Sequence, residues 1–131
     1  MISPGTFGTT YADAQRCSLR EDDRIRIQHM IDAAEIAAQF IAGRVRVDVD
    51  SDRMLLFALV RSIEILGEAA GRVTTETQAL IPSVPWLSII GMRNRLIHGY
   101  FDVDPEIVWK TVTEELPDLL EALRRAAKGA G

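Results

Sequence analysis

The residues best suited to chemistry in this sequence lie in one short stretch, from Arg93 to Tyr100. His98 stands five residues after Arg93 and two before Tyr100. A histidine, whose ordinary pKa is about 6.5, can take up or release a proton at neutral pH. An arginine offers a planar fork of N–H donors to phosphate oxygens, and a tyrosine adds a hydroxyl or a ring on which a base can stack. Together these three residue types are typical of a phosphodiester site.

Helical geometry divides this stretch into two parts. At about 100° per residue, positions 94 and 98 of a continuous helix share a face, whereas positions 93 and 98 lie about 140° apart. Asn94 is therefore expected to orient the ring of His98 better than Arg93 can. Arg93 has to reach around the helix or meet the partner subunit's His98, so the spacing favours a site assembled across a dimer.

The same spacing also has a purely structural interpretation. A surface arginine followed by a histidine at a helix C-terminus is favoured because the negative end of the helix dipole attracts cations. An arginine and a histidine five positions apart also occur by chance in many helices. The other histidine of the chain, His29, falls in the middle of a predicted helix, and we expect it to be structural or exposed.

The composition is that of one ordinary globular domain. The chain has 131 residues, of which 47% are hydrophobic, enough to form a core without cross-links. The single cysteine, Cys17, excludes an internal disulfide framework and a cysteine-rich metal site, and fits a reducing cytoplasm. The longest apolar run covers residues 54–60, far short of the about 20 residues of a membrane span, and no signal peptide is recognisable. We therefore expect a cytoplasmic protein without a membrane anchor.

The net charge of −4 limits what kind of nucleic-acid contact is possible. Wrapping a long stretch of nucleic acid requires many lysines and arginines to neutralise phosphates. An acidic protein can nevertheless cut one exposed phosphodiester at a local basic site.

Hydrophobic periodicity predicts two helices before the reactive stretch. The first begins near Ser18, which has capping-box spacing to Glu21, and Gly43 marks its end. The second begins within the cluster at residues 50–52, any of which can cap it, and carries an apolar stripe as far as Val73.

Two further helices contain or follow the reactive stretch. The third runs from about residue 85 to residue 97, with Gly99 as its terminator. The fourth begins at Asp104, which can cap a helix whose first turn contains Pro105. Pro117 lies inside this helix and should kink or break it.

These elements predict an all-α fold, an antiparallel bundle of four to five helices. Residues 45–49 alternate in polarity, but they are too few for more than a short linker. Residues 1–18 show no helical period, and we expect them to form a flexible N-terminal arm before a helical domain at residues 19–128.

The second predicted helix carries charged residues three or four positions apart, which are Arg61, Glu64, Glu68 and Arg72. One interpretation is a solvated face with salt bridges between successive turns. The other is that Glu64 or Glu68 contacts Arg93 and helps to hold it in place. The spacing alone leaves both open.

The stretch from Ile90 to Tyr100, IGMRNRLIHGY, resembles the signature of the HepT-like proteins, a branch of the HEPN superfamily. The family pattern is arginine, four residues, histidine, any residue and tyrosine, and Arg93, His98 and Tyr100 match it. Blocks at residues 51–56, 64–70, 100–104 and 107–109 also resemble the family. The resemblance covers residues 19 to 125 and leaves the first 18 outside it.

This resemblance implies a HEPN-like helical ribonuclease domain that forms a homodimer, with the two Arg/His motifs facing each other in a cleft. It implies metal-independent, cofactor-free RNA cleavage by the toxin of a type II toxin–antitoxin pair. The implied partner is a minimal nucleotidyltransferase antitoxin that transfers AMP from ATP onto Tyr100.

The resemblance also suggests a role for each residue of the motif. Arg93 and His98 are the expected catalytic residues, with Arg93 on the phosphate and His98 in proton transfer. Asn94 supports them by orienting the ring or the substrate. AMP on Tyr100 would place a bulky anion beside Arg93, where it blocks RNA and competes for the same cation.

Two other functions fit the same sequence. One is a non-catalytic HEPN-type module that binds a nucleotidyltransferase partner, a nucleotide or RNA. The other is a purely structural helical dimer, which leaves the polar cluster without a role. Growth arrest that depends on Arg93 and His98 would favour the nuclease, whereas failure of the purified protein to cut RNA would favour the binding module.

Overall fold

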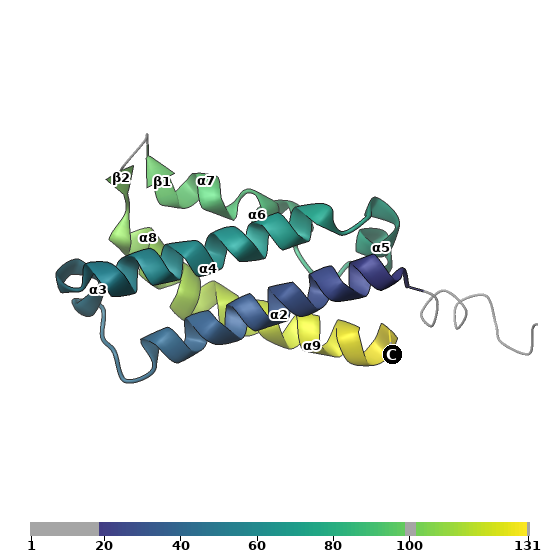
Figure 1. Cartoon of the computed structure of the whole chain (residues 1–131), viewed down its shortest axis with the longest axis horizontal. Coiled ribbons are helices and arrows are strands. Elements are labelled where there is room, and N and C mark those ends of the chain that lie inside the picture. The colour runs from purple at the N-terminus through teal and green to yellow at the C-terminus, as the bar shows by residue number, and fades with distance from the viewer. Residues whose placement is uncertain (1–18, 99–101, 131) are drawn as a thin grey trace, which may run out of the picture.

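Two long antiparallel helices, α2 (Glu21–Ile41) and α4 (Arg53–Arg72), form the centre of the fold (Figure 1). The computed structural model describes residues 19–98 and 102–130. The C-terminal helix α9 (Leu116–Ala130) packs against the other side of α2. The remaining elements are α3 (Asp48–Ser51), α5 (Thr75–Leu80), α6 (Trp86–Ile90), α7 (Met92–Leu96), β1 (Ile97–His98), β2 (Asp102–Val103), α8 (Pro105–Lys110) and the π-helical turn η1 (Thr111–Glu115).

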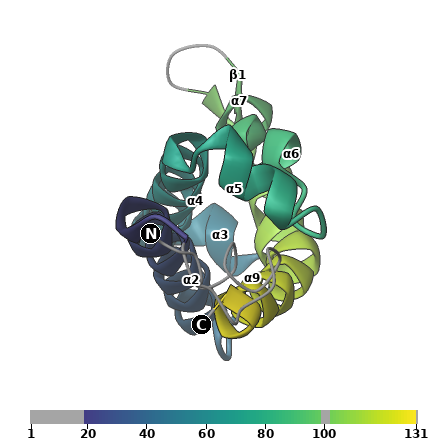
Figure 2. The same ribbon diagram turned by 90° about the vertical axis from the view of Figure 1, so that its right-hand side faces the viewer.

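The core lies between these helices, and its side chains repeat at helical spacing. Viewed along the bundle, α2, α4, α6 and α9 surround it, while α7 and β1 lie on the side away from α2 and α9 (Figure 2). The largest fully buried apolar side chains come from α2, α4, α6, α7 and α9 and are Met30, Leu59, Ile63, Leu66, Ile89, Leu96 and Leu123. The prediction of an all-α antiparallel bundle is confirmed, since the only sheet in the described part of the chain has two residues per strand.

Side-chain caps begin two of the helices where the sequence predicts them. Asp52 accepts a hydrogen bond from the backbone N–H of Leu55 at 3.1 Å, and this bond is the main cause of the lowered pKa of its carboxyl. Asp104 accepts from the N–H of Glu106 at 3.0 Å. The first helix begins at Glu21, later than predicted, and the side chain of Arg20 at its N-cap makes no capping hydrogen bond. Ser18, the predicted cap, lies outside the described residues.

A buried carboxylate connects the start of α2 to the start of α5. Asp23 is 1% exposed and accepts hydrogen bonds from the backbone N–H of Thr74 at 3.0 Å and from the hydroxyls of Thr74 and Thr77 at 2.7 and 2.5 Å. Burial raises the pKa of Asp23, but the hydrogen bonds from Thr77 and Thr74 outweigh it, so that the pKa is lowered overall.

Pro117 interrupts the fourth predicted helix, as its ring requires. A proline has no N–H to donate and crowds the carbonyl four residues before it. The chain responds with the π turn η1, in which the N–H of Leu116 bonds to the carbonyl of Thr111, five residues back. The helix resumes as α9, and Leu119 and Leu123 still face the core.

Within the described ranges, no helix is both long enough and apolar enough to cross a membrane. The predicted N-terminal arm at residues 1–18 lies outside those ranges. Within them, the helices follow one another in the predicted order.

Candidate functional site

The third predicted helix is not continuous, which corrects the prediction for residues 85–97. It breaks at Gly91 into α6 and α7, and α7 ends at Leu96. The N–H of Gly91 still bonds to the carbonyl of Leu87 at 3.0 Å, so Gly91 caps the end of α6 directly before α7 begins. Arg93 and Asn94 lie on α7, whereas His98 follows its end.

His98 belongs to a short antiparallel hairpin instead of a helix. Residue Ile97 pairs with Val103 and His98 pairs with Asp102 across the two strands. The N–H of Asp104 donates to the carbonyl of Leu96 at 2.9 Å and closes the base of the hairpin.

The prediction that Asn94 and His98 share a helical face is therefore wrong. The hydrogen bonds of the two strands and of the hairpin base hold the chain extended after Leu96. Asn94 is exposed on α7. Gly99, the predicted terminator, and Tyr100, the predicted modification site, lie outside the described residues.

Arg93 turns toward α4 and meets Glu64. Its Nε lies 3.0 Å from Oε2 of Glu64, and NH1 of Arg61 lies 3.8 Å from the other carboxylate oxygen. The side chain of Arg93 is 56% exposed and that of Glu64 is 26% exposed. The Nε bond uses one of five N–H donors of the guanidinium, so Glu64 orients Arg93 without occupying its terminal fork.

A close helix contact places Arg93 beside Glu64. Gly67 is buried where α4 meets α6, and a Cβ at this position would lie 3.2 Å from the carbonyl oxygen of Ile89 and 3.7 Å from that of Ile90. Any larger residue would push α6, and with it the start of α7, away from α4.

These contacts border a groove with a volume of about 380 Å³. Its wall on α4 consists of Arg61, Glu64, Gly67, Glu68 and Gly71, and its other wall of Ile90 and Arg93. The structure thus brings both predicted supporting carboxylates, Glu64 and Glu68, to one groove with Arg93, while Asn94 is not among the lining residues.

Within one subunit, Arg93 and His98 lie on successive but different elements. Three helical steps and two extended steps give a rise of about 11 Å along the chain between them. Arg93 is held by α4, whereas His98 lies on β1, which follows α7 and pairs with β2 (Figures 1 and 2). The two residues therefore depend on different supports, which the sequence spacing does not reveal.

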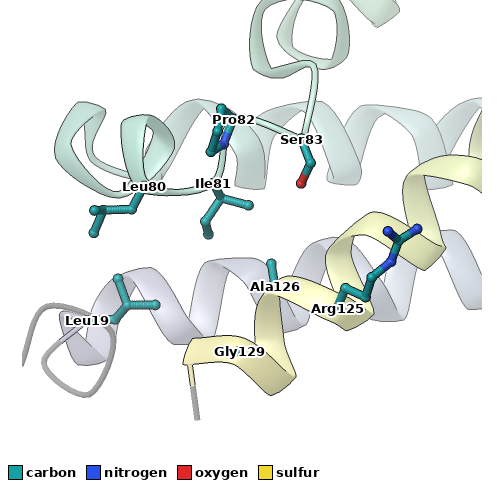
Figure 3. A pocket seen from close by; sticks show the side chains of 8 residues that line it. All are labelled: Leu19, Leu80, Ile81, Pro82, Ser83, Arg125, Ala126 and Gly129. Carbon is teal, nitrogen blue, oxygen red and sulfur yellow. The ribbon is translucent and has the colours of Figure 1, made fainter. Parts of the chain in front are cut away.

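A second pocket lies between α9, the start of α2 and the segment after α5 (Figure 3). Its lining is mostly apolar, and its one charged residue, Arg125, pairs with Glu121. It shares no residue with the Arg93 groove. In the described ranges no three His, Cys, Asp or Glu residues come together as a possible metal site.

Three residues that line the groove were not predicted as site residues from the sequence. Arg61 appears in the sequence only as part of a charged helix face, and Gly67 and Gly71 as parts of a helix. The available signal was the pair of glycines four residues apart, because such spacing places two small residues on one face and lets another chain approach.

Comparison with known proteins agrees with the resemblance to the family. The family model "Ribonuclease HepT-like" matches residues 30–126. A "Probable ribonuclease HepT" of Thermococcus cleftensis is 35% identical over 102 residues, which cover 76% of this chain and 93% of the relative. A "Putative RNase" of Caldanaerobacter subterraneus is 38% identical over 93 residues, which cover 71% of this chain and 83% of the relative.

No solved structure gives a significant match. The family model nevertheless spans most of the described helices, including α4, α7 and the hairpin that carry the groove and the motif. The chain therefore belongs to the ribonuclease HepT-like family.

Proposed function

We propose that this protein is a metal-independent RNA endonuclease whose catalytic residues are Arg93 and His98. The observation that carries the proposal is the Nε contact of Arg93 with Glu64, which holds an exposed guanidinium at the edge of a groove. The same segment continues directly into the hairpin strand of His98. Membership of the ribonuclease HepT-like family supports RNA as the substrate.

The chemistry follows from a nucleophile that RNA itself provides, the 2′-OH. His98 takes the proton of this hydroxyl as its oxygen bonds to phosphorus. Arg93 stabilises the negative charge on the phosphate oxygens. The bond from phosphorus to the 5′ oxygen breaks, and that oxygen takes a proton from water while His98 returns its proton to the solvent, leaving a 2′,3′-cyclic phosphate and a 5′-hydroxyl.

We further propose that the protein acts as the toxin of a type II toxin–antitoxin pair. Its antitoxin is a minimal nucleotidyltransferase that attaches AMP to Tyr100, two residues after His98. A phosphate so close to the motif would compete with RNA for Arg93. Asn94, which is exposed beside Arg93, would help to orient the substrate. Incubation with the partner and ATP should therefore release pyrophosphate and add one adenylyl group, the mass of AMP less one water, to the peptide that contains Tyr100.

Cleavage assays of the purified protein test the nuclease directly. We expect Arg93→Ala and His98→Ala to abolish cleavage, a 2′-deoxy substitution at the cut site to block it, and a chelator to leave it unchanged. Expression of the parent protein should arrest growth, and either substitution should relieve the arrest. If both variants cut RNA as fast as the parent, the catalytic assignment is wrong; binding of RNA without cleavage would support the binding module instead.

The separate supports of Arg93 and His98 favour a site completed across a homodimer. A mixture of Arg93→Ala and His98→Ala subunits tests this, because a heterodimer then contains one intact composite site. Random pairing in a two-fold dimer should restore about a quarter of the parental activity. If each site lies within one chain, the mixture stays inactive.

A further inference from the structure

The groove beside Arg93 offers both hydrogen-bond donors and acceptors. Arg61 and Arg93 supply guanidinium groups, and their side chains are 69% and 56% exposed. Glu64 and Glu68 supply carboxylate oxygens on the wall formed by α4. A site for a simple anion would need the cations alone, whereas a nucleotide presents phosphate acceptors together with ribose O–H and base N–H donors.

The groove also has a direction. Arg61 and Gly71 lie ten residues apart on α4, a distance of about 15 Å along the helix axis. Figure 1 shows α6, α7 and β1 following one another along α4 toward its N-terminal half. Arg61 therefore lies at the end of the groove nearer the hairpin of His98, and Gly71 lies at the far end.

The far end of the groove is kept open by a missing side chain. A Cβ at Gly71 would have no atom within 4 Å, in contrast to one at Gly67, which would meet the backbone of α6. Gly71 lies in the last turn of α4 without a positive φ, so the backbone does not require a glycine there. The absence of a side chain matters for the shape of the groove and not for the fold.

We propose that this groove binds the RNA strand next to the scissile phosphate, with Arg61 contacting a flanking phosphate and Gly71 leaving space for the adjoining nucleotide. The proposal rests on the ribonuclease function proposed above and defines a substrate subsite for it. Glu68 accepts a hydrogen bond from a ribose hydroxyl or a base N–H of that nucleotide. Glu64 contacts Arg61 on its own wall and Arg93 on the opposite wall, so that consecutive phosphates meet consecutive guanidinium groups.

Two substitutions test the subsite from opposite ends. Gly71→Met fills the far end, and because it replaces a helical glycine that has open space beside it, its melting temperature should be no lower than that of the parent. Arg61→Gln removes the proposed phosphate contact. Arg72→Gln is the matched control, since it removes the same charge from the same helix but does not line the groove.

The probe for binding is a short single-stranded RNA with 2′-O-methyl groups, which removes the nucleophile and prevents cleavage. We expect each substitution to raise the Kd of this RNA about tenfold. Arg61→Gln removes one charge-assisted contact, and Gly71→Met has a similar effect because it fills the space of one nucleotide. The slope of log K against log salt should fall by about 0.7 for Arg61→Gln, as for one lost phosphate contact on a single strand. Arg72→Gln should change neither quantity.

Different results separate this proposal from the proposed function. Cleavage by the parent with unchanged KM in Gly71→Met and Arg61→Gln would overturn the subsite and leave the nuclease intact. Oligonucleotide binding that depends on both residues, without cleavage by the parent, would support the subsite and reject the nuclease. If free AMP displaces the oligonucleotide at equal concentration, the groove is a mononucleotide site and the proposal for an RNA strand is wrong.

Discussion

The contact between Glu64 and Arg93 should matter far more for cleavage than for stability. Both side chains are partly exposed, with 26% and 56% of their surfaces accessible, and such a pair contributes about 0.5 kcal/mol to the free energy of unfolding. Glu64→Ala should therefore lower the melting temperature by no more than about 3 °C in a chain of this length.

The effect on the rate follows from the freedom that Arg93 regains. An arginine side chain carries about 2 kcal/mol of rotamer entropy, and Glu64 holds the guanidinium through its Nε at 3.0 Å. If Arg93 had to lose all of that freedom again before each reaction, the rate would fall by a factor of about 30. Because part of the freedom stays restricted by packing, we expect kcat to fall about tenfold. KM should stay the same or decrease, because Glu64→Ala also removes a negative charge from the groove.

The chain offers a closely matched control for this experiment. Arg95, on the same helix α7, pairs with Glu115 at 3.3 Å, and the two side chains are 45% and 43% exposed. Glu115→Ala should cost similar stability and leave kcat unchanged, and Glu64→Gln should recover part of the lost rate because its amide oxygen can still accept from Nε. Single-turnover RNA cleavage and thermal melts measure both quantities. Equal loss of kcat in Glu64→Ala and Glu115→Ala would refute a positioning role for Glu64.

Three further substitutions test the packing of the fold. Gly67→Ala places a Cβ 3.2 Å from the carbonyl of Ile89, and it should destabilise the fold by about 1 kcal/mol even after the gain in helix propensity. Gly71→Ala adds a Cβ in open space and should stabilise the fold by up to about 1 kcal/mol. Thermal melts that shift in the same direction for both variants would contradict this. Asp23→Ala should cost about 3 kcal/mol at pH 7, because buried donors of Thr74 and Thr77 lose a charged acceptor. Since the folded pKa of Asp23 is lowered, its contribution is present above the unfolded pKa of about 3.9 and is lost as the pH falls through the folded pKa. Denaturant titrations from pH 7 to pH 3 should therefore show the parent and Asp23→Ala converging, and a gap independent of pH would disprove the assignment.

The sequence was sufficient for those parts of the fold that depend on neighbouring residues. The caps at Asp52 and Asp104 and the interruption at Pro117 follow from side-chain chemistry that acts within one or two turns. The apolar stripe of the second helix likewise identifies its buried face, including Leu59 and Leu66. These local rules were enough to predict the fold class.

The shape of the site depends on contacts between distant parts of the chain, which periodicity cannot show. The helix after Gly91 ends at Leu96 because that carbonyl accepts the N–H of Asp104 and the strands pair across the hairpin. The pairing of Arg93 with Glu64 joins residues 29 positions apart, so the sequence could name both residues without deciding between a solvated face and this contact.

The π turn before Pro117 also affects how this chain can change in length. A π turn contains one residue more than an α-helical turn occupying the same place. Losing one residue within Thr111–Glu115 would convert the wide turn to a regular one and leave α9 in its present rotation. The same loss within α9 would rotate everything beyond it by about 100° and carry Leu123 out of the core. Among natural variants that differ in length here, single-residue gaps should therefore fall in this turn, where the helix can absorb them without repacking the bundle.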